Sequence, residues 1–221
     1  CKVAGNEGWL WQGGSSRDTY LGVMFGLGST LMTLRGSPAA ATQYALAQTV
    51  FERVFDKLSS DLYFIVYPLN CIKSLREQCV PVNPTPTFIA AWERVALFVN
   101  PDKYGKSVQR HYDTWLAIAM KTEFITPIGH SGYYGNNLLS ECWYIIERME
   151  RMAGGKQAAA VTSTVLRLLA AYKPHLQANL NAYHVAAAND TAGPWHTITQ
   201  ALLWDFPDPP DPERHIDQHN N

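Results

Sequence analysis

The sequence predicts an all-α protein built from antiparallel helical hairpins. Apolar residues recur at helical spacing along most of the chain, and Gly and Pro stop signals divide these stretches at short intervals. Consecutive helices joined by short connections pack as antiparallel neighbours in a bundle, a solenoid or a toroid. Periodicity alone does not distinguish these three architectures.

In the first half of the chain, Ser15 or Ser16 is expected to cap the first helix, which has Asp18 in its first turn. Gly36 ends this helix and Pro38 begins the next, which runs to about residue 59. The apolar run 62–66 is expected to be non-helical, and a Pro-rich linker follows it. The next helices are expected over about 87–98 and 104–121.

In the second half, the stretch 126–135 is rich in Gly and aromatic residues and is expected to be a loop. Asn136 or Asn137 then opens a helix that ends before Gly154, and Pro174 separates two of the helices that follow. The expected ranges are about 136–152, 156–172, 174–188 and 195–204.

Length and composition indicate one domain, expected over residues 1–205, with a Pro-rich C-terminal tail over 206–221. Lys and Arg number 18 against 19 Asp and Glu, without a basic run, so nucleic acid is not an expected partner. No apolar stretch approaches the roughly 20 residues of a membrane-spanning helix, so no span is expected.

The cysteines allow several interpretations. Cys1 is either a lipidation site, a cut site or, less in keeping with a chain poor in strands, an N-terminal nucleophile. Cys71 and Cys79 flank a short segment and are a candidate disulfide, or two buried thiols. No zinc or haem spacing is present, so neither a metal nor a cofactor is expected.

Two groups of residues inside the helices have expected structural roles. Gly22, Gly26 and Gly28 lie within the first helix, where glycine costs stability, and are expected to let another helix or a ligand approach the backbone. Three tryptophans lie on apolar helix faces and are expected in the core: Trp92, Trp115 and Trp143.

Three segments carry recognisable motifs. The run 14–27 resembles a G-x-x-S-R-D-Q-Y helix start, with Thr19 in place of Gln. The run 132–138 is similar to a Tyr-Asn-x-Asn-Leu helix start, and 206–217 to a closing F-P-x-P-P and R-x-x-D stretch. Together these segments resemble a family of bacterial exported (α/α)-toroid proteins of unknown function. The resemblance implies a toroid, or a partial toroid because a six-hairpin ring has more helices. It also implies an exported location and no particular activity.

In toroids related to glycoside hydrolases and polysaccharide lyases, the loops that start inner helices line a cleft. Asp18 and Glu141 lie at such helix starts and are the candidate catalytic pair, since glycoside hydrolysis needs two carboxylates about 5–9.5 Å apart. A lyase would instead use a Tyr or His base, such as His184, beside an Asn or Arg. Structural alternatives are an ion pair of Asp18 with Arg17 and an ordinary polar position for Glu141. The candidate substrate-binding residues are Trp9, Trp11, Arg17, Tyr20, Tyr134 and Asn137.

These observations predict an exported helical-toroid protein that binds or processes a glycan, with its status as an enzyme left open. The alternative is a non-catalytic accessory subunit of a surface assembly, with protein partners and a lipid anchor at Cys1. A glycan site requires the loops over 11–20 and 133–137 to meet across one cavity.

Overall fold

The computed structural model describes residues 2–3, 6–10, 17–63, 85–122, 133–170 and 178–204, with the backbone alone for 2–3, 6–10, 133 and 134. The described chain is all-α, as predicted, apart from a short antiparallel hairpin of β1 (Lys2–Val3) and β2 (Asn6–Leu10). The helices are α1 (Arg17–Leu34), α2 (Ala41–Ser60), α3 (Pro86–Val99), α4 (Pro101–Thr122), α5 (Tyr133–Met152), α6 (Ala158–Ala170), α7 (Ala178–Ala188) and α8 (Pro194–Trp204), with a 3₁₀ turn, η1 (Pro38–Ala40), before α2.

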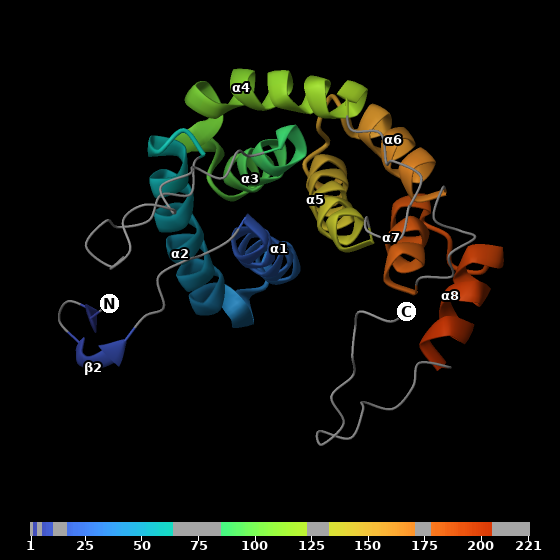
Figure 1. Cartoon of the computed structure of the whole chain (residues 1–221), viewed down its shortest axis with the longest axis horizontal. Coiled ribbons are helices and arrows are strands. Elements are labelled where there is room, and N and C mark those ends of the chain that lie inside the picture. Colours follow the sequence, from blue (N-terminus) through green and yellow to red (C-terminus); the bar gives the residue numbers. More distant parts are fainter. Residues whose placement is uncertain are drawn as a thin grey trace, which may run out of the picture.

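The helices form an arc of four consecutive hairpins (Figure 1). Helices α3, α5 and α7 follow the inside of the arc, and α1 packs against α2, α3 and α5 on the concave side. Helices α4 and α6 cover the outside, while α2 and α8 lie at the two ends. Each even-numbered helix packs against the odd-numbered helix before it, so the antiparallel hairpin is the repeating unit.

The four odd-numbered helices run in the same direction. Where two odd-numbered helices are in contact, residues further along one helix lie next to residues further along the other. This order of contacts occurs only when the two helices are parallel. The neighbouring pairs are Leu21 with Leu138 and Gly28 with Ile145 for α1 and α5, Thr85 with Leu138 and Arg94 with Glu150 for α3 and α5, and Asn137 with Asn179 and Tyr144 with Tyr183 for α5 and α7. All four helices therefore begin at one end of the molecule, which we call the helix-start end.

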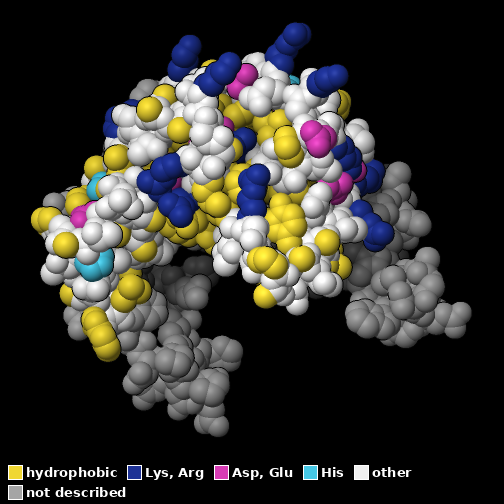
Figure 2. Space-filling model, turned by 180° about the vertical axis from the view of Figure 1, so that it is seen from behind, with side chains coloured by type: hydrophobic (Ala, Val, Ile, Leu, Met, Phe, Trp, Pro, Cys, Tyr) yellow, Lys and Arg dark blue, Asp and Glu magenta, His cyan; other side chains and the backbone are white. Residues whose placement is uncertain are grey.

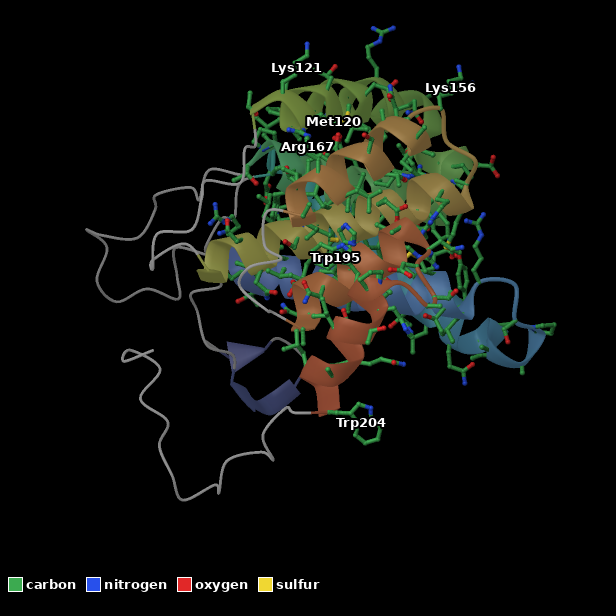
Figure 3. The ribbon with its side chains drawn as sticks, turned by 90° about the vertical axis from the view of Figure 1, so that its right-hand side faces the viewer. Met120, Lys121, Lys156, Arg167, Trp195 and Trp204 are labelled. Atoms are coloured by element: carbon green, nitrogen blue, oxygen red, sulfur yellow. The ribbon has the colours of Figure 1, made fainter. Side chains whose placement is uncertain are left out.

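The outer helices run back the other way. Lys121 and Arg167, near the ends of α4 and α6, lie toward the helix-start end, and Lys156, just before α6, lies toward the opposite end (Figure 3). Only one face of α4 is buried, and Lys and Arg side chains project along the outer rim over this helix (Figure 2). An inner parallel row with an antiparallel outer row is compatible with part of an (α/α) toroid.

Helix α3 is the most deeply buried element because α1, α2, α4 and α5 surround it. Every residue from 87 to 99 is buried, including Glu93 and Arg94. Charges excluded from water are costly unless they are paired, so both side chains need partners from other helices. Arg94 pairs with Glu150 of α5, and Glu93 contacts His111 of α4.

Two helices begin earlier than predicted. Helix α5 starts at Tyr133, so the expected loop over 126–135 is wrong for its last residues, because Gly135 is accommodated within the first turn. Helix α4 starts at Pro101 rather than near 104, since the Asn100 side chain caps it by accepting a hydrogen bond from the Lys103 backbone N–H at 3.1 Å. The hairpin over 2–10 was not predicted.

Several other predictions can be compared with the structure. Trp92 and Trp143 are fully buried, as predicted, and Trp115 is half-buried. The disulfide candidates Cys71 and Cys79, the lipidation candidate Cys1, the caps Ser15 and Ser16 and the tail 206–221 lie outside the described residues. None of the helices described is both long enough and apolar enough to cross a membrane.

The glycines of α1 differ in their surroundings. A Cβ on Gly28 would lie 3.2 Å from Ile145 Cδ1 and 3.4 Å from Val95 Cγ2, so this glycine lets three helices pack closely, as expected. A Cβ on Gly22 or Gly26 would meet nothing within 4 Å, so neither is needed for helix packing.

Gly26→Ala is therefore expected to raise the free energy of unfolding by about 0.5–1 kcal/mol, because alanine loses less conformational entropy in a helix interior. Urea denaturation followed by circular dichroism measures the change. Gly28→Ala is the control, and we expect a smaller gain or a loss there because its methyl group must displace Ile145 or Val95. Equal gains at the two positions would contradict this account of α1.

Candidate functional site

The starts of α1 and α5 meet at the helix-start end around one pocket of about 270 Å³. Arg17 contributes from α1 and Gly135 from α5, and Thr85, the N-cap of α3, completes the polar part of the wall. The remaining lining residues are Leu21, Thr122, Leu138, Leu139 and Cys142. Arg17 belongs to the predicted segment 11–20 and Gly135 to the segment 133–137, so both segments contribute a described residue to the wall of this pocket.

Near the start of α5, a chain of hydrogen bonds joins this helix to α7, and its three residues are not among those that line the pocket. Asn137 Nδ2 donates to Glu141 Oε1 at 3.1 Å, across one turn of α5. Asn179 Nδ2 of α7 donates in turn to Asn137 Oδ1. All three side chains are half-buried, so they are held in place while part of each stays accessible.

An aromatic cluster continues from this chain toward the middle of the helices. The rings of Tyr144 and Tyr183 lie 5.0 Å apart, and Phe25 of α1 lies 6.1 Å and 6.3 Å from them, respectively. The three rings come from three parallel helices, so they close the space between α1, α5 and α7.

Electrostatics in this cluster favour the uncharged forms of two groups. Burial raises the pKa of the Glu141 carboxyl above its ordinary value, and the hydrogen bond from Asn137 opposes that effect. Burial, together with the nearby charges of Glu141 and Tyr144, raises the pKa of Tyr183 to about 12. Glu141 therefore keeps its proton to a higher pH than a solvated glutamic acid.

The predicted catalytic pair is not joined in the structure. Asp18 forms an ion pair with its neighbour Arg17, with Arg17 Nε 3.9 Å from Asp18 Oδ1. Among the described residues, neither a hydrogen bond nor an ion pair links Asp18 to Glu141. The structure thus shows the Arg17 pairing that was the structural alternative for Asp18.

The predicted binding residues have different positions. Arg17 lines the pocket and Asn137 belongs to the hydrogen-bond chain. Tyr20 packs toward the core, with its ring centroid 6.4 Å from that of Trp92. The side chains of Trp9, Trp11 and Tyr134 lie outside the described part of the chain.

Sequence reasoning missed Asn179 and Tyr183 of α7. These residues are four apart, as are Asn137 and Glu141, and in both helices the pair begins in the first turn or shortly after it. This repeated spacing of an amide and a second polar residue was a signal that could have identified α7 as part of the site.

Within the described ranges, His, Cys, Asp and Glu side chains form no group of three or more that could hold a metal ion. A scan against protein-family models, a search of curated proteins and a search of solved structures each found no match for this chain. The function of the site is therefore inferred from its own geometry.

Proposed function

We propose that this protein binds a glycan at the helix-start end, between the first turns of α1, α5 and α7. The observation that carries the proposal is the hydrogen-bond chain Asn179–Asn137–Glu141, which lies toward the same end of the molecule as the pocket lined by Arg17. Sugar hydroxyls both donate and accept hydrogen bonds, and amide and carboxylate side chains held in fixed positions offer both complements. Tyr183 adds an aromatic ring within the same cluster.

The chemistry of the site favours binding over glycoside hydrolysis. Hydrolysis ordinarily uses two carboxylates. Burial raises the pKa of Glu141, but Asp18 pairs with Arg17, and no second carboxylate joins Glu141 among the described contacts. The proposal is therefore a binding function, in which Glu141 accepts hydrogen bonds or donates its proton to a sugar hydroxyl. We further predict from the sequence that the protein is exported, that Cys1 is a candidate for a lipid anchor and that the arc is part of a toroid.

Asn137→Ala is expected to weaken oligosaccharide binding about tenfold, or ~1.4 kcal/mol, because it removes one sugar contact and releases both Glu141 and Asn179. The measurement is a screen of neutral and uronate-containing oligosaccharides, followed by calorimetric titration of the best ligand. Glu141→Gln keeps the shape of the side chain and tests the carboxyl group separately.

The matched control is Gln109→Ala on α4. Gln109 Nε2 donates to Asp113 Oδ1 at 2.9 Å, which is the same amide-to-carboxylate bond across one turn, but on the outer helix. This variant is expected to bind the oligosaccharide like the wild type. Failure of every oligosaccharide to bind, or equal affinity of Asn137→Ala and wild type, would contradict the proposal.

The exposed apolar side chains at the two ends of the arc favour a second function, as a subunit of an assembly. Leu203 is 57% and Trp204 87% exposed at the end of α8, where Trp204 projects away from the helices (Figure 3). Leu46 of α2 is 65% exposed at the other end of the arc. Such residues are typical of contact surfaces when they gather. Light scattering over a range of protein concentrations tests self-association, which Trp204→Ser would weaken.

A further inference from the structure

A second polar cluster lies between α2, α3 and α4, away from the proposed glycan site. Its centre is Glu93, which is fully buried in the middle of α3. The hydroxyl of Tyr63 and the ring Nδ1 of His111 both contact the same carboxylate oxygen, Oε1. The other oxygen, Oε2, is buried and has no hydrogen-bond partner. A buried carboxylate oxygen without a hydrogen-bond partner is costly, so among the described residues Oε2 is a free acceptor at the centre of this cluster.

The hydrogen bond from Trp115 determines which ring nitrogen of His111 carries the proton. An indole N–H only donates, and Trp115 Nε1 donates to His111 Nε2 at 2.8 Å. Nε2 is therefore the acceptor, and the proton of the neutral imidazole lies on Nδ1, toward Glu93. Both donors are thus used on Oε1, and neither reaches Oε2.

Glu93 lines a pocket of about 450 Å³ that is large enough for a small organic molecule. The charged and titratable groups that face it are Asp56 of α2, Glu93 of α3, Tyr63 of the turn after α2, and Lys103, Tyr104 and His111 of α4. The other lining residues are Phe55, Ser59, Leu62, Ser107 and Val108.

The only cation among these lining groups is already neutralised. Lys103 Nζ lies 2.8 Å from Asp56 Oδ2 and 3.0 Å from Glu52 Oε2, and Tyr104 donates to Asp56 at 2.8 Å. With His111 neutral, the remaining charge among the lining groups is negative whenever the Glu93 carboxyl is ionised, and it lies on that carboxylate. A ligand that meets this charge must itself carry a positive charge.

The backbone at the pocket wall is held in an uncommon conformation. Leu62 and Tyr63 have φ values of 54° and 63°, in the left-handed region that non-glycine residues rarely adopt. A hydrogen bond from the Tyr63 backbone N–H to the Leu58 carbonyl at 2.8 Å caps α2 in this conformation. The turn thereby places the Tyr63 hydroxyl on Glu93 and stacks its ring 5.8 Å from that of His111. Strain of this kind is often found at binding sites.

We propose that this pocket binds a small primary organic ammonium ion, which donates to Glu93 Oε2 and lies against the rings of Tyr63 and Tyr104. A primary ammonium has three donors and a positive charge, so it supplies both the missing hydrogen bond and the missing charge. The aromatic rings stabilise it further by cation–π attraction. The apolar residues of the wall accept the organic part of the ligand.

The proposal predicts a particular pH dependence of ligand binding, because Glu93 can carry a proton in the free protein. Burial raises the pKa of the Glu93 carboxyl, against the lowering effect of the hydrogen bonds from Tyr63 and His111. At a pH below this pKa, the Glu93 carboxyl is protonated in the free protein, and it must lose this proton when an ammonium ion binds. Binding is therefore expected to release a proton and to weaken as the pH falls through the pKa of Glu93.

The test uses the full chain with benzylammonium as the probe and benzyl alcohol as its neutral analogue. Calorimetric titration in two buffers of different ionisation enthalpy gives the affinity and the number of protons released. We expect saturable binding of benzylammonium, at least about tenfold weaker binding of benzyl alcohol, and proton release. The Trp115 indole N–H signal in NMR spectra should shift on binding, because Trp115 is connected to the site through His111.

Glu93→Gln keeps the shape of the side chain, removes its charge and is expected to weaken benzylammonium binding at least about tenfold. If this variant does not fold, Tyr63→Phe tests the same site, since loss of its hydroxyl raises the pKa of Glu93 and moves the pH dependence of binding upward. Gln109→Ala on the exposed face of α4 serves as the unchanged control. Absence of binding, equal binding of benzyl alcohol, or binding unaffected in both Glu93→Gln and Tyr63→Phe would each overturn the proposal.

Discussion

Arg94→Met is expected to lower the free energy of unfolding by about 3–5 kcal/mol, because it leaves Glu150 buried without its cation. Arg94 Nε lies 3.0 Å from Glu150 Oε1, and Nη2 donates to the Met149 carbonyl at 2.7 Å near the end of α5. Both charged side chains are almost fully buried. The one substitution thus removes an ion pair and a helix-end hydrogen bond from the contact between α3 and α5. Urea denaturation, with a check that two spectroscopic probes give one transition, measures the loss.

The double variant Arg94→Met/Glu150→Leu separates the cost of the unpaired charge from the value of the pair. Replacing a buried ion pair by apolar side chains of similar size is often neutral, so the double variant is expected to regain most of the lost stability. Tyr112 also donates to Glu150, at 3.0 Å, so the recovery should be incomplete while that hydroxyl remains. A loss below about 1 kcal/mol in Arg94→Met would show that Glu150 finds compensation elsewhere.

Trp92→Ala is expected to cost about 3–5 kcal/mol, the range for removing a large aromatic side chain from a core. Trp92 is fully buried, and its ring stacks on Phe51 of α2 at 5.5 Å and lies 6.4 Å from Tyr20 of α1. The cavity would therefore open where three helices meet. The change is measured by urea denaturation under the same conditions.

Trp204→Ala provides the matched control for Trp92→Ala, because it removes the same side chain at a site that is 87% exposed. Its effect on the stability of the monomer is expected to stay within about 0.5 kcal/mol. Similar losses for the two variants would mean that Trp92 does not hold α1, α2 and α3 together.

Helix positions could be predicted from the sequence because capping residues, Pro and Gly are local signals. Pro38 and Gly154 lie where the structure changes direction, as expected. The start of α5 was placed too late because Gly135 and its aromatic neighbours are typical of loops, and only packing against α1 and α3 overrides that preference.

The partners of polar residues could not be predicted in the same way. Asn137 and Glu141 are visible as a pair because their spacing on one helix is fixed. The contact of Asn137 with Asn179 depends on α5 and α7 being parallel neighbours, which no local pattern encodes. Glu93 gives no sequence signal either, since a charged residue in a helix usually faces water. Its burial results from the four helices that surround α3.

The common direction of the odd-numbered helices has a consequence for how this fold tolerates change in chain length. Connections from each odd-numbered helix to the next helix are short at one end of the molecule, at 35–40, 100, 153–157 and 189–193. Connections at the helix-start end cover 61–85, 123–132 and 171–177. Insertions between an even-numbered helix and the next odd-numbered helix would enter the chain at the helix-start end and leave the short connections at the far end unchanged. The scaffold is therefore suited to grafting of new recognition loops at one end, with the opposite end serving as its constant framework.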